Sequence, residues 1–157
     1  MKRSISILVF FHAVTMAFSQ QAMTFQDAEE AGVEMKDLDV DYPSPLDSDS
    51  ASVIIFGIDT QQYISYYREY LDELGEYLSK KGFKWERPRW CFNKIYFNKE
   101  GRVDYFLYNF RPGEITDEMA TDFQIHLEKF VKKSEFPAKP NTAFSQCSPV
   151  TYADAKE

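Results

Sequence analysis

Residues 92–110, FNKIYFNKEGRVDYFLYNF, decide the fold predicted for this chain. Seven of these nineteen residues are Phe or Tyr, and they flank one polar tetrapeptide, Asn98-Lys99-Glu100-Gly101. That tetrapeptide is typical of a type I turn closed by a left-handed glycine, which predicts a β-hairpin. The second strand, 103–110, is largely apolar or aromatic on both faces. Such a strand lies inside a sheet with side chains packed on each face, so most of the rings are predicted to be core.

Two amphipathic helices are predicted on either side of the hairpin. The first covers residues 59–82, capped by Asp59 or Thr60 and ended by Gly82. Its inward stripe is predicted to be Ile64, Tyr67, Leu71, Leu74 and Leu78, with Tyr63, Tyr70 and Tyr77 along the edge of that stripe. The second covers about residues 117–134 and is capped by Thr116. Its apolar face is formed by Met119, Phe123, Leu127, Phe130 and Val131.

Two further strands complete the predicted sheet. SVIIFG at 52–57 is a short apolar run between polar residues, which favours a strand. AFSQCSPVTY at 143–152 has strand propensity interrupted by Pro149, which is typical of an edge strand. The predicted class is therefore α+β, with a small, mainly antiparallel sheet built on the central hairpin and covered by two helices on one face.

The first residues, MKRSISILVFFHAVTMAFSQQA, have the pattern of an export signal: basic residues, an apolar run and small residues near a cleavage point. We expect residues 1–22 to be removed and the protein to be exported to the periplasm, the outer membrane or the outside of the cell. Residues 23–50 are predicted to be an acidic, extended arm with a short helical turn near 25–31. Residues 51–157 are predicted to form a single domain, with no membrane span after signal cleavage.

The charge balance disfavours two classes of partner. The chain has 18 Lys and Arg against 25 Asp and Glu, a net charge of -7, which becomes -9 without Lys2 and Arg3. An acidic chain repels phosphate backbones, so nucleic acid is not an expected partner. The same argument disfavours an anionic membrane surface.

Two cysteines, Cys91 and Cys147, leave two interpretations open. In an exported chain they form a disulfide that ties the hairpin to the C-terminal segment. Alternatively, both remain buried thiols that pack as small apolar residues.

The residues that catalysis requires are scarce. After the leader, His126 is the one histidine, and it borders the apolar face of the second helix. No catalytic residue is predicted, and the chain is not expected to be an enzyme or to need a cofactor. Asp37, Asp39 and Asp41 have alternate spacing, but an EF-hand loop would need a glycine at Tyr42 and a glutamate at Ser48. No metal site is therefore predicted.

The segment Lys84-Trp85-Glu86-Arg87-Pro88-Arg89-Trp90 is the candidate binding site. Its Trp85, Arg87, Arg89 and Trp90 belong to the two residue types that are enriched at interface hot spots. Tryptophan rings also stack on sugars. The alternative is that both tryptophans cap one end of the core with their N–H groups near water.

Two segments, FKWERPRWCFNKIYFNKEGRVDYFLYNF and FSQCSPVTY, resemble a group of small exported proteins of Bacteroidetes-type bacteria. That resemblance implies export and a shared fold, and it assigns no catalytic residue. The order of hairpin, helix, EFPAKP and final strand is also similar to the C-terminal domain of TonB-type energy transducers. The hypotheses are a non-catalytic binding or scaffolding protein of the envelope, a glycan-binding accessory protein, and a TonB-like periplasmic interaction domain.

Overall fold

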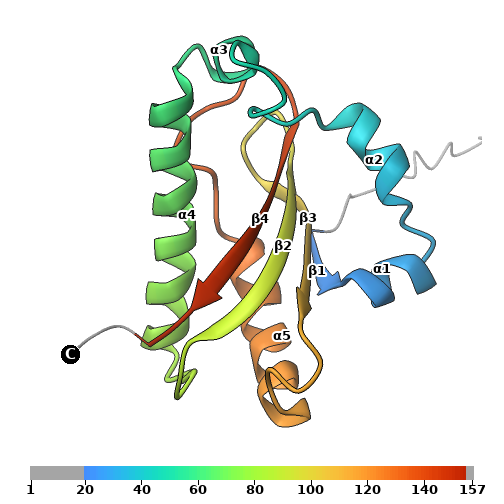
Figure 1. Ribbon diagram of the computed structural model, residues 1–157, viewed down its shortest axis with the longest axis vertical. Coiled ribbons are helices and arrows are strands. Elements are labelled where there is room, and N and C mark those ends of the chain that lie inside the picture. The colour runs from blue at the N-terminus through green and yellow to red at the C-terminus, as the bar shows by residue number, and fades with distance from the viewer. Residues whose placement is uncertain (1–19, 155–157) are drawn as a thin grey trace, which may run out of the picture.

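A computed structural model describes residues 20–154, which form an α+β fold around one four-stranded sheet (Figure 1). The strands are β1 (Gln21–Thr24), β2 (Arg89–Phe97), β3 (Val103–Phe110) and β4 (Phe144–Tyr152). Their order across the sheet is β1-β3-β2-β4. β2 is antiparallel to β3 and β4, whereas β1 is parallel to β3. The α+β class is confirmed, and the sheet is mixed rather than purely antiparallel.

The hairpin that the sequence predicts is present. Its turn is held by the side chain of Asn98, whose Oδ1 accepts hydrogen bonds from the N–H groups of Glu100 and Arg102. Gly101 has φ of 81°, the left-handed conformation that closes this kind of turn. In the ladder Asn93 pairs with Tyr108, and a bulge follows Tyr96.

Helices α4 (Thr60–Lys80) and α5 (Asp117–Val131) cover one face of the sheet, as predicted. The Asp59 carboxylate caps α4 by accepting from the N–H of Gln62, and the Thr116 hydroxyl caps α5 in the same way. One detail of the α4 stripe differs from the prediction. Tyr63 and Tyr70 are fully buried instead of lying at its edge, whereas Ile64 and Leu71 are only half-buried. Their hydroxyl groups can be buried because they bond Gln146 at 2.7 Å and Ser134 at 3.0 Å.

The main core lies between these helices and the sheet and is rich in aromatic rings. The fully buried aromatic side chains of this layer are Tyr63, Tyr70, Phe97, Phe106, Phe123 and Phe144. Phe97 and Phe144 lie on neighbouring strands and stack with centroids 4.7 Å apart. Four of the seven rings of the hairpin are therefore interior, while Phe92, Tyr105 and Phe110 are half-buried.

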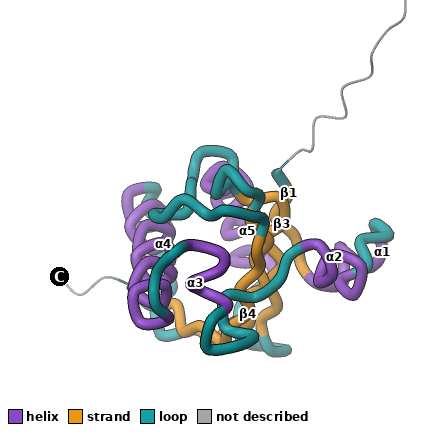
Figure 2. The backbone as a smooth tube through the Cα atoms, turned by 90° about the horizontal axis from the view of Figure 1, so that it is seen from above, coloured by secondary structure: helices purple, strands orange, loops and turns teal. Residues whose placement is uncertain are grey.

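The opposite face of the sheet carries a second, smaller cluster, which corrects the predicted arm. Residues 23–50 are not simply extended: they contain the end of β1, then α1 (Phe25–Glu30), where the helical turn was predicted, and α2 (Met35–Asp41), which was not. Figure 2 shows both helices on the side of the sheet away from α4 and α5. They cover Tyr96 and Leu107 with a set of scattered apolar residues: Phe25, Ala28, Val33, Met35, Leu38 and Tyr42. The Tyr42 hydroxyl also donates to Asp104 at 2.8 Å.

The strand predicted at 52–57 is wrong, because this segment is helix α3 (Ala51–Phe56). The helix ends at Gly57, whose φ is 73°. Ile55 is buried, whereas Val53 and Ile54 are exposed, so one side of a single helical turn supplies the contact. The Ile55 carbonyl accepts a hydrogen bond from Asn141 N–H in the segment that precedes β4.

Most of the predicted leader, residues 1–22, lies outside the described residues. Its last two residues, Gln21 and Ala22, begin β1. Ala22 is 4% exposed, and its carbonyl accepts a hydrogen bond from the Gln124 side chain on α5. Cleavage after residue 22 would remove half of this strand. Cleavage before Gln21 would leave the strand whole.

The two cysteines point to opposite faces of the sheet. Cys91 pairs with Val150, whereas Cys147 pairs with Lys94. Paired residues point the same way, and residues an odd number of positions apart on a strand point in opposite directions. Cys91 is therefore buried beneath the helices and Cys147 is exposed on the other face. A Cys91–Cys147 disulfide, one of the two interpretations left open by the sequence, does not fit this geometry, because the sheet separates the sulfur atoms. The other interpretation, two buried thiols, holds for Cys91 alone.

The two thiols are expected to differ strongly in reactivity. Burial raises the pKa of the Cys91 thiol to about 12, which lowers its thiolate fraction near neutral pH. An alkylating reagent at about pH 8 should modify Cys147 and leave Cys91 at least about a hundredfold slower until the protein unfolds. Mass spectrometry of the digested protein gives both rates. Equal rates, or a peptide in which the two cysteines are joined, would contradict the assignment of the faces.

Candidate functional site

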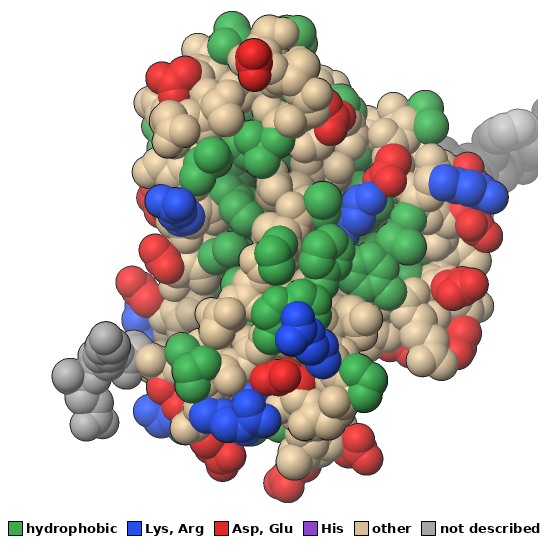
Figure 3. All heavy atoms as spheres, viewed as in Figure 1, with side chains coloured by type: hydrophobic (Ala, Val, Ile, Leu, Met, Phe, Trp, Pro, Cys, Tyr) green, Lys and Arg blue, Asp and Glu red, His purple; other side chains and the backbone are tan. Residues whose placement is uncertain are grey.

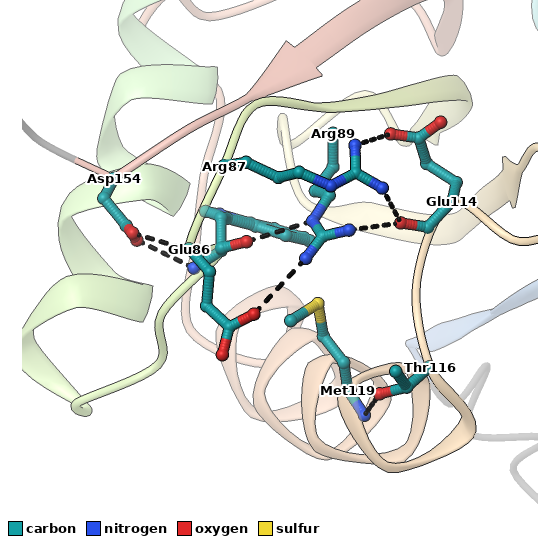
Figure 4. A network of polar contacts seen from close by, with 8 residues as sticks. Glu86, Arg87, Arg89, Glu114, Thr116, Met119 and Asp154 are labelled. Atoms are coloured by element: carbon teal, nitrogen blue, oxygen red, sulfur yellow. Dashed lines mark hydrogen bonds and ion pairs between the residues drawn. The ribbon is translucent and has the colours of Figure 1, made fainter.

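The candidate site segment, residues 84–90, makes many polar contacts with other parts of the chain that stabilise the fold (Figure 4). Arg89 is 7% exposed, and its guanidinium donates to the carbonyl groups of Trp85 at 3.0 Å and Glu114 at 2.6 Å. The Asp154 carboxylate accepts from the N–H groups of Trp85 and Glu86. These two hydrogen bonds help to hold Glu86 at φ of 63°, which is strained for a residue other than glycine.

Trp85 belongs to the core, so the core interpretation of this segment, which covered both tryptophans, holds for Trp85 and not for Trp90. It is 3% exposed and stacks on Tyr152 with centroids 5.0 Å apart and an angle of 8° between the rings. Arg87 is exposed and pairs with Glu114 at 3.4 Å. Of the four predicted site residues, Trp85 and Arg89 are therefore not accessible to a ligand, whereas Arg87 and Trp90 are.

Trp90 differs from Trp85 because it points to the other face of the sheet. It pairs with Thr151 of β4 and is half-buried. The guanidinium carbon of Arg111 lies 4.0 Å from the centroid of the Trp90 ring, a close cation–π contact. Arg111, which follows β3 directly, was not among the predicted site residues. No signal in the sequence indicates that this arginine folds back over Trp90.

The face around Trp90 is the part of the sheet that no helix covers. We call it the open half, and its residues are Trp90, Phe92, Asn109, Cys147, Pro149 and Thr151. All six are exposed or half-buried, and Trp90 and Phe92 belong to neither buried cluster. Figure 3 shows hydrophobic side chains gathered across the middle of this view, over the strands. α1 reaches only the margin of the open half, where Phe25 contacts Phe92 with centroids 6.0 Å apart.

The outer edge of β4 is poorly suited to pairing with an added strand. Ser145 points its N–H away from β2 and donates it to Pro43 at 3.2 Å. Because orientation alternates, residues 147, 149 and 151 also point to this edge. Pro149 has no N–H, and the Cys147 carbonyl already accepts from the Gln146 side chain at 2.7 Å. A partner strand added at this edge would find one N–H donor missing and one carbonyl acceptor already occupied on β4. A partner is therefore more favourably bound through side chains than through strand pairing.

A groove of about 640 Å³ lies between α4 and the C-terminal part of β4. Its lining includes Arg68, Leu71, Asp72, Gly75, Val150 and Tyr152. Gly75 leaves the helix side of the groove open, since nothing lies within 4 Å of a Cβ built there. Neither histidine nor cysteine lines the groove. Its charged groups are on the exposed surface of α4, which suits polar contact better than nucleophilic chemistry.

His126 packs between aromatic rings. Its ring contacts Tyr77 and Phe83 edge-on, with centroids 6.4 and 6.2 Å away. Its Nδ1 atom is buried and has no hydrogen-bond partner among the described residues. Within residues 20–154, no group of three or more His, Cys, Asp or Glu is placed to hold a metal ion. No helix in that part of the chain is both long and apolar enough to cross a membrane.

Comparison with known proteins gives no relative from which a function could be transferred. No family model, no curated protein and no solved structure matches the chain. The open half is therefore interpreted from its own chemistry.

Proposed function

We propose that this chain is an exported, non-catalytic binding protein of the cell envelope that contacts a partner protein through the open half of its sheet. The leader pattern in residues 1–19 supports export. The position of Trp90 and Phe92 outside both cores is the observation that carries the binding surface. Large aromatic side chains left outside the core at a sheet face are typical of interaction sites.

The chemistry of the open half favours a protein over a glycan. Sugar rings bind tryptophan by stacking on its face, and the guanidinium of Arg111 occupies a face of Trp90. Arg111 has no carboxylate within 4.0 Å among the described residues. A partner segment that presents an Asp or Glu to Arg111 and apolar side chains to Phe92 and Pro149 would satisfy both features.

A photo-cross-linking residue at Asn109 tests this proposal in the native envelope. Asn109 is exposed within the open half, and exposed Gln61 on α4 is the control position on the opposite side of the sheet. We expect a specific polypeptide to be cross-linked from position 109 and not from position 61. Adding Trp90→Ala or Arg111→Glu should reduce this product about tenfold or more, because both changes remove hot-spot contacts.

Both variants must keep the thermal unfolding midpoint near that of the parent, so that lost contact is separated from lost fold. The same product from both positions, or a product insensitive to Trp90→Ala, would contradict the proposal. A glycan array run on the same proteins tests the alternative: glycan binding that is lost in Trp90→Ala would replace the protein partner with a sugar.

A further inference from the structure

A second feature, independent of the open half, lies between the C-terminal ends of α4 and α5. Here a hollow of about 240 Å³ is lined by Tyr77, Lys81, His126, Lys129, Lys132 and Lys133. Four of the 18 basic residues of this acidic chain therefore surround one hollow. The hollow is on the helical side of the molecule, whereas the acidic helices α1 and α2 are on the other side of the sheet (Figure 2).

The lysines of the hollow form no ion pair with a carboxylate of the described residues. None of its four lysines has a carboxylate within 4.0 Å among the described residues. Glu73 and Glu76 line an adjoining hollow that shares Tyr77 and Lys133, and Glu76 is paired there with Lys80 at 3.0 Å. Acidic groups across the sheet are also screened, since the Debye length is about 8 Å at physiological ionic strength.

Aromatic side chains hold part of this charge in place. The Lys81 ammonium lies 5.6 Å from the centroid of the Tyr77 ring. His126, packed against that ring, adds an imidazole to the wall, and its Nδ1 has no partner in the described part of the chain. Lysines near helix ends also offset the negative C-terminal dipole. That effect accounts for a lysine on each helix but does not require four of them to converge on one hollow.

We propose that this hollow binds a phosphate group carried by a phosphomonoester. Such a group carries a charge of about −1.5 to −2 at pH 7 and has three acceptor oxygens, which matches several ammonium donors better than a single carboxylate does. The phosphate belongs either to a soluble ester or to the headgroup of an anionic lipid. The overall negative charge of the chain does not prevent this, because screening leaves the local lysines in control of close contact.

Two probes distinguish these sources. Glycerol phosphate is titrated while the amide signals of Lys129–Lys133 are followed by NMR, and vesicles of phosphatidylcholine with and without phosphatidic acid are tested by co-sedimentation. The test variant is Lys129→Gln with Lys133→Gln, which keeps good helix formers. The matched control is Lys99→Gln with Lys139→Gln, which removes equal charge from exposed lysines that do not line the hollow.

We expect the protein to bind at least one of the two probes, glycerol phosphate or phosphatidic acid vesicles. The test variant should weaken this binding about tenfold or more, and the control variant should leave it nearly unchanged. Added salt should reduce it. Binding of glycerol phosphate identifies a soluble ester, and binding of phosphatidic acid vesicles alone identifies a lipid headgroup. Absence of binding in both arms, or an equal loss in the test and control variants, would overturn the proposal. The open half plays no part in this test, so its outcome is independent of the proposed protein partner.

Discussion

Phe97→Ala is expected to lower the free energy of unfolding by about 3–5 kcal/mol, the range for removing a buried aromatic ring. Phe97 is fully buried, stacks on Phe144 at 4.7 Å and meets Tyr70 edge-on at 5.1 Å. Removing the ring leaves a cavity among rigid aromatic neighbours that cannot collapse to fill it. Urea unfolding followed by circular dichroism measures the change.

Phe92 provides a matched control, since it has the same side chain on the same strand but points to the open half. Phe92→Ala is expected to reduce stability by only about 1 kcal/mol, because its ring is already partly in water. The ratio of the two effects identifies which face of β2 is interior. Equal losses would mean that the open half is in fact covered, and the proposed binding surface would be withdrawn.

The elements that could be predicted from the sequence are those whose signals are local. The hairpin follows from Asn98 to Gly101, and the boundaries of α4 and α5 follow from the caps Asp59 and Thr116. Each signal lies within a few residues of the structure it determines, and each also agrees with the tertiary packing. These three elements are therefore the reliable part of the prediction.

Segments whose conformation depends on distant contacts were predicted less well. SVIIFG is short enough for either a strand or a helical turn, and a contact of Ile55 with the chain near Asn141 accompanies the helix. Residues 23–50 contain nine acidic residues, and the apolar side chains that cover Tyr96 and Leu107 are scattered among them. The sequence of this segment therefore shows no regular apolar pattern. The parallel pairing of β1 with β3 was not predicted, because Gln21 and Ala22 of β1 were assigned to the leader.

The candidate site shows the same division. Alternation along β2 places Trp90 and Phe92 on the face of the sheet opposite Cys91. Alternation cannot say whether that face is covered, since the answer depends on where α1 and α2 end. The sequence also cannot distinguish Trp85 from Trp90, because the stacking of Trp85 on Tyr152 joins residues far apart in the chain.

Alkaline unfolding is expected to be steep, because several buried groups lose a proton only with difficulty. Burial raises the pKa of Tyr67 and of Cys91 to about 12, from ordinary values of 10.0 and 9.0. Burial also raises the pKa values of Tyr63, Tyr70 and Tyr152 well above the ordinary value. In the unfolded chain all these groups are exposed to water and deprotonate at their ordinary values.

The direction in which stability changes with pH follows from which state, folded or unfolded, binds more protons. Below about pH 8 both states keep these protons, so these groups do not change the stability. As the pH rises through 9 and 10, the unfolded state releases protons that the folded state retains, and stability falls until the folded pKa values are reached. By pH 11, one unit above its ordinary pKa, each buried tyrosine has lowered stability by about 1.4 kcal/mol, so four of them together remove about 6 kcal/mol. That loss is comparable to the whole stability of a small domain, which places unfolding near about pH 11.

Tyrosinate absorbance and circular dichroism, recorded together from neutral to strongly alkaline pH, check this expectation. The absorbance of the buried tyrosines should appear in one cooperative step that coincides with loss of the helical signal. Tyr67→Phe is the informative variant, because its hydroxyl partner Ser148, at 2.7 Å, is half-buried and can turn to water. It should lose about 1 kcal/mol at neutral pH and shift the alkaline midpoint upward relative to that baseline, since one titrating group is gone. If tyrosinate absorbance reached the full amplitude of the unfolded chain while the protein stayed folded, the rings would not be buried as described.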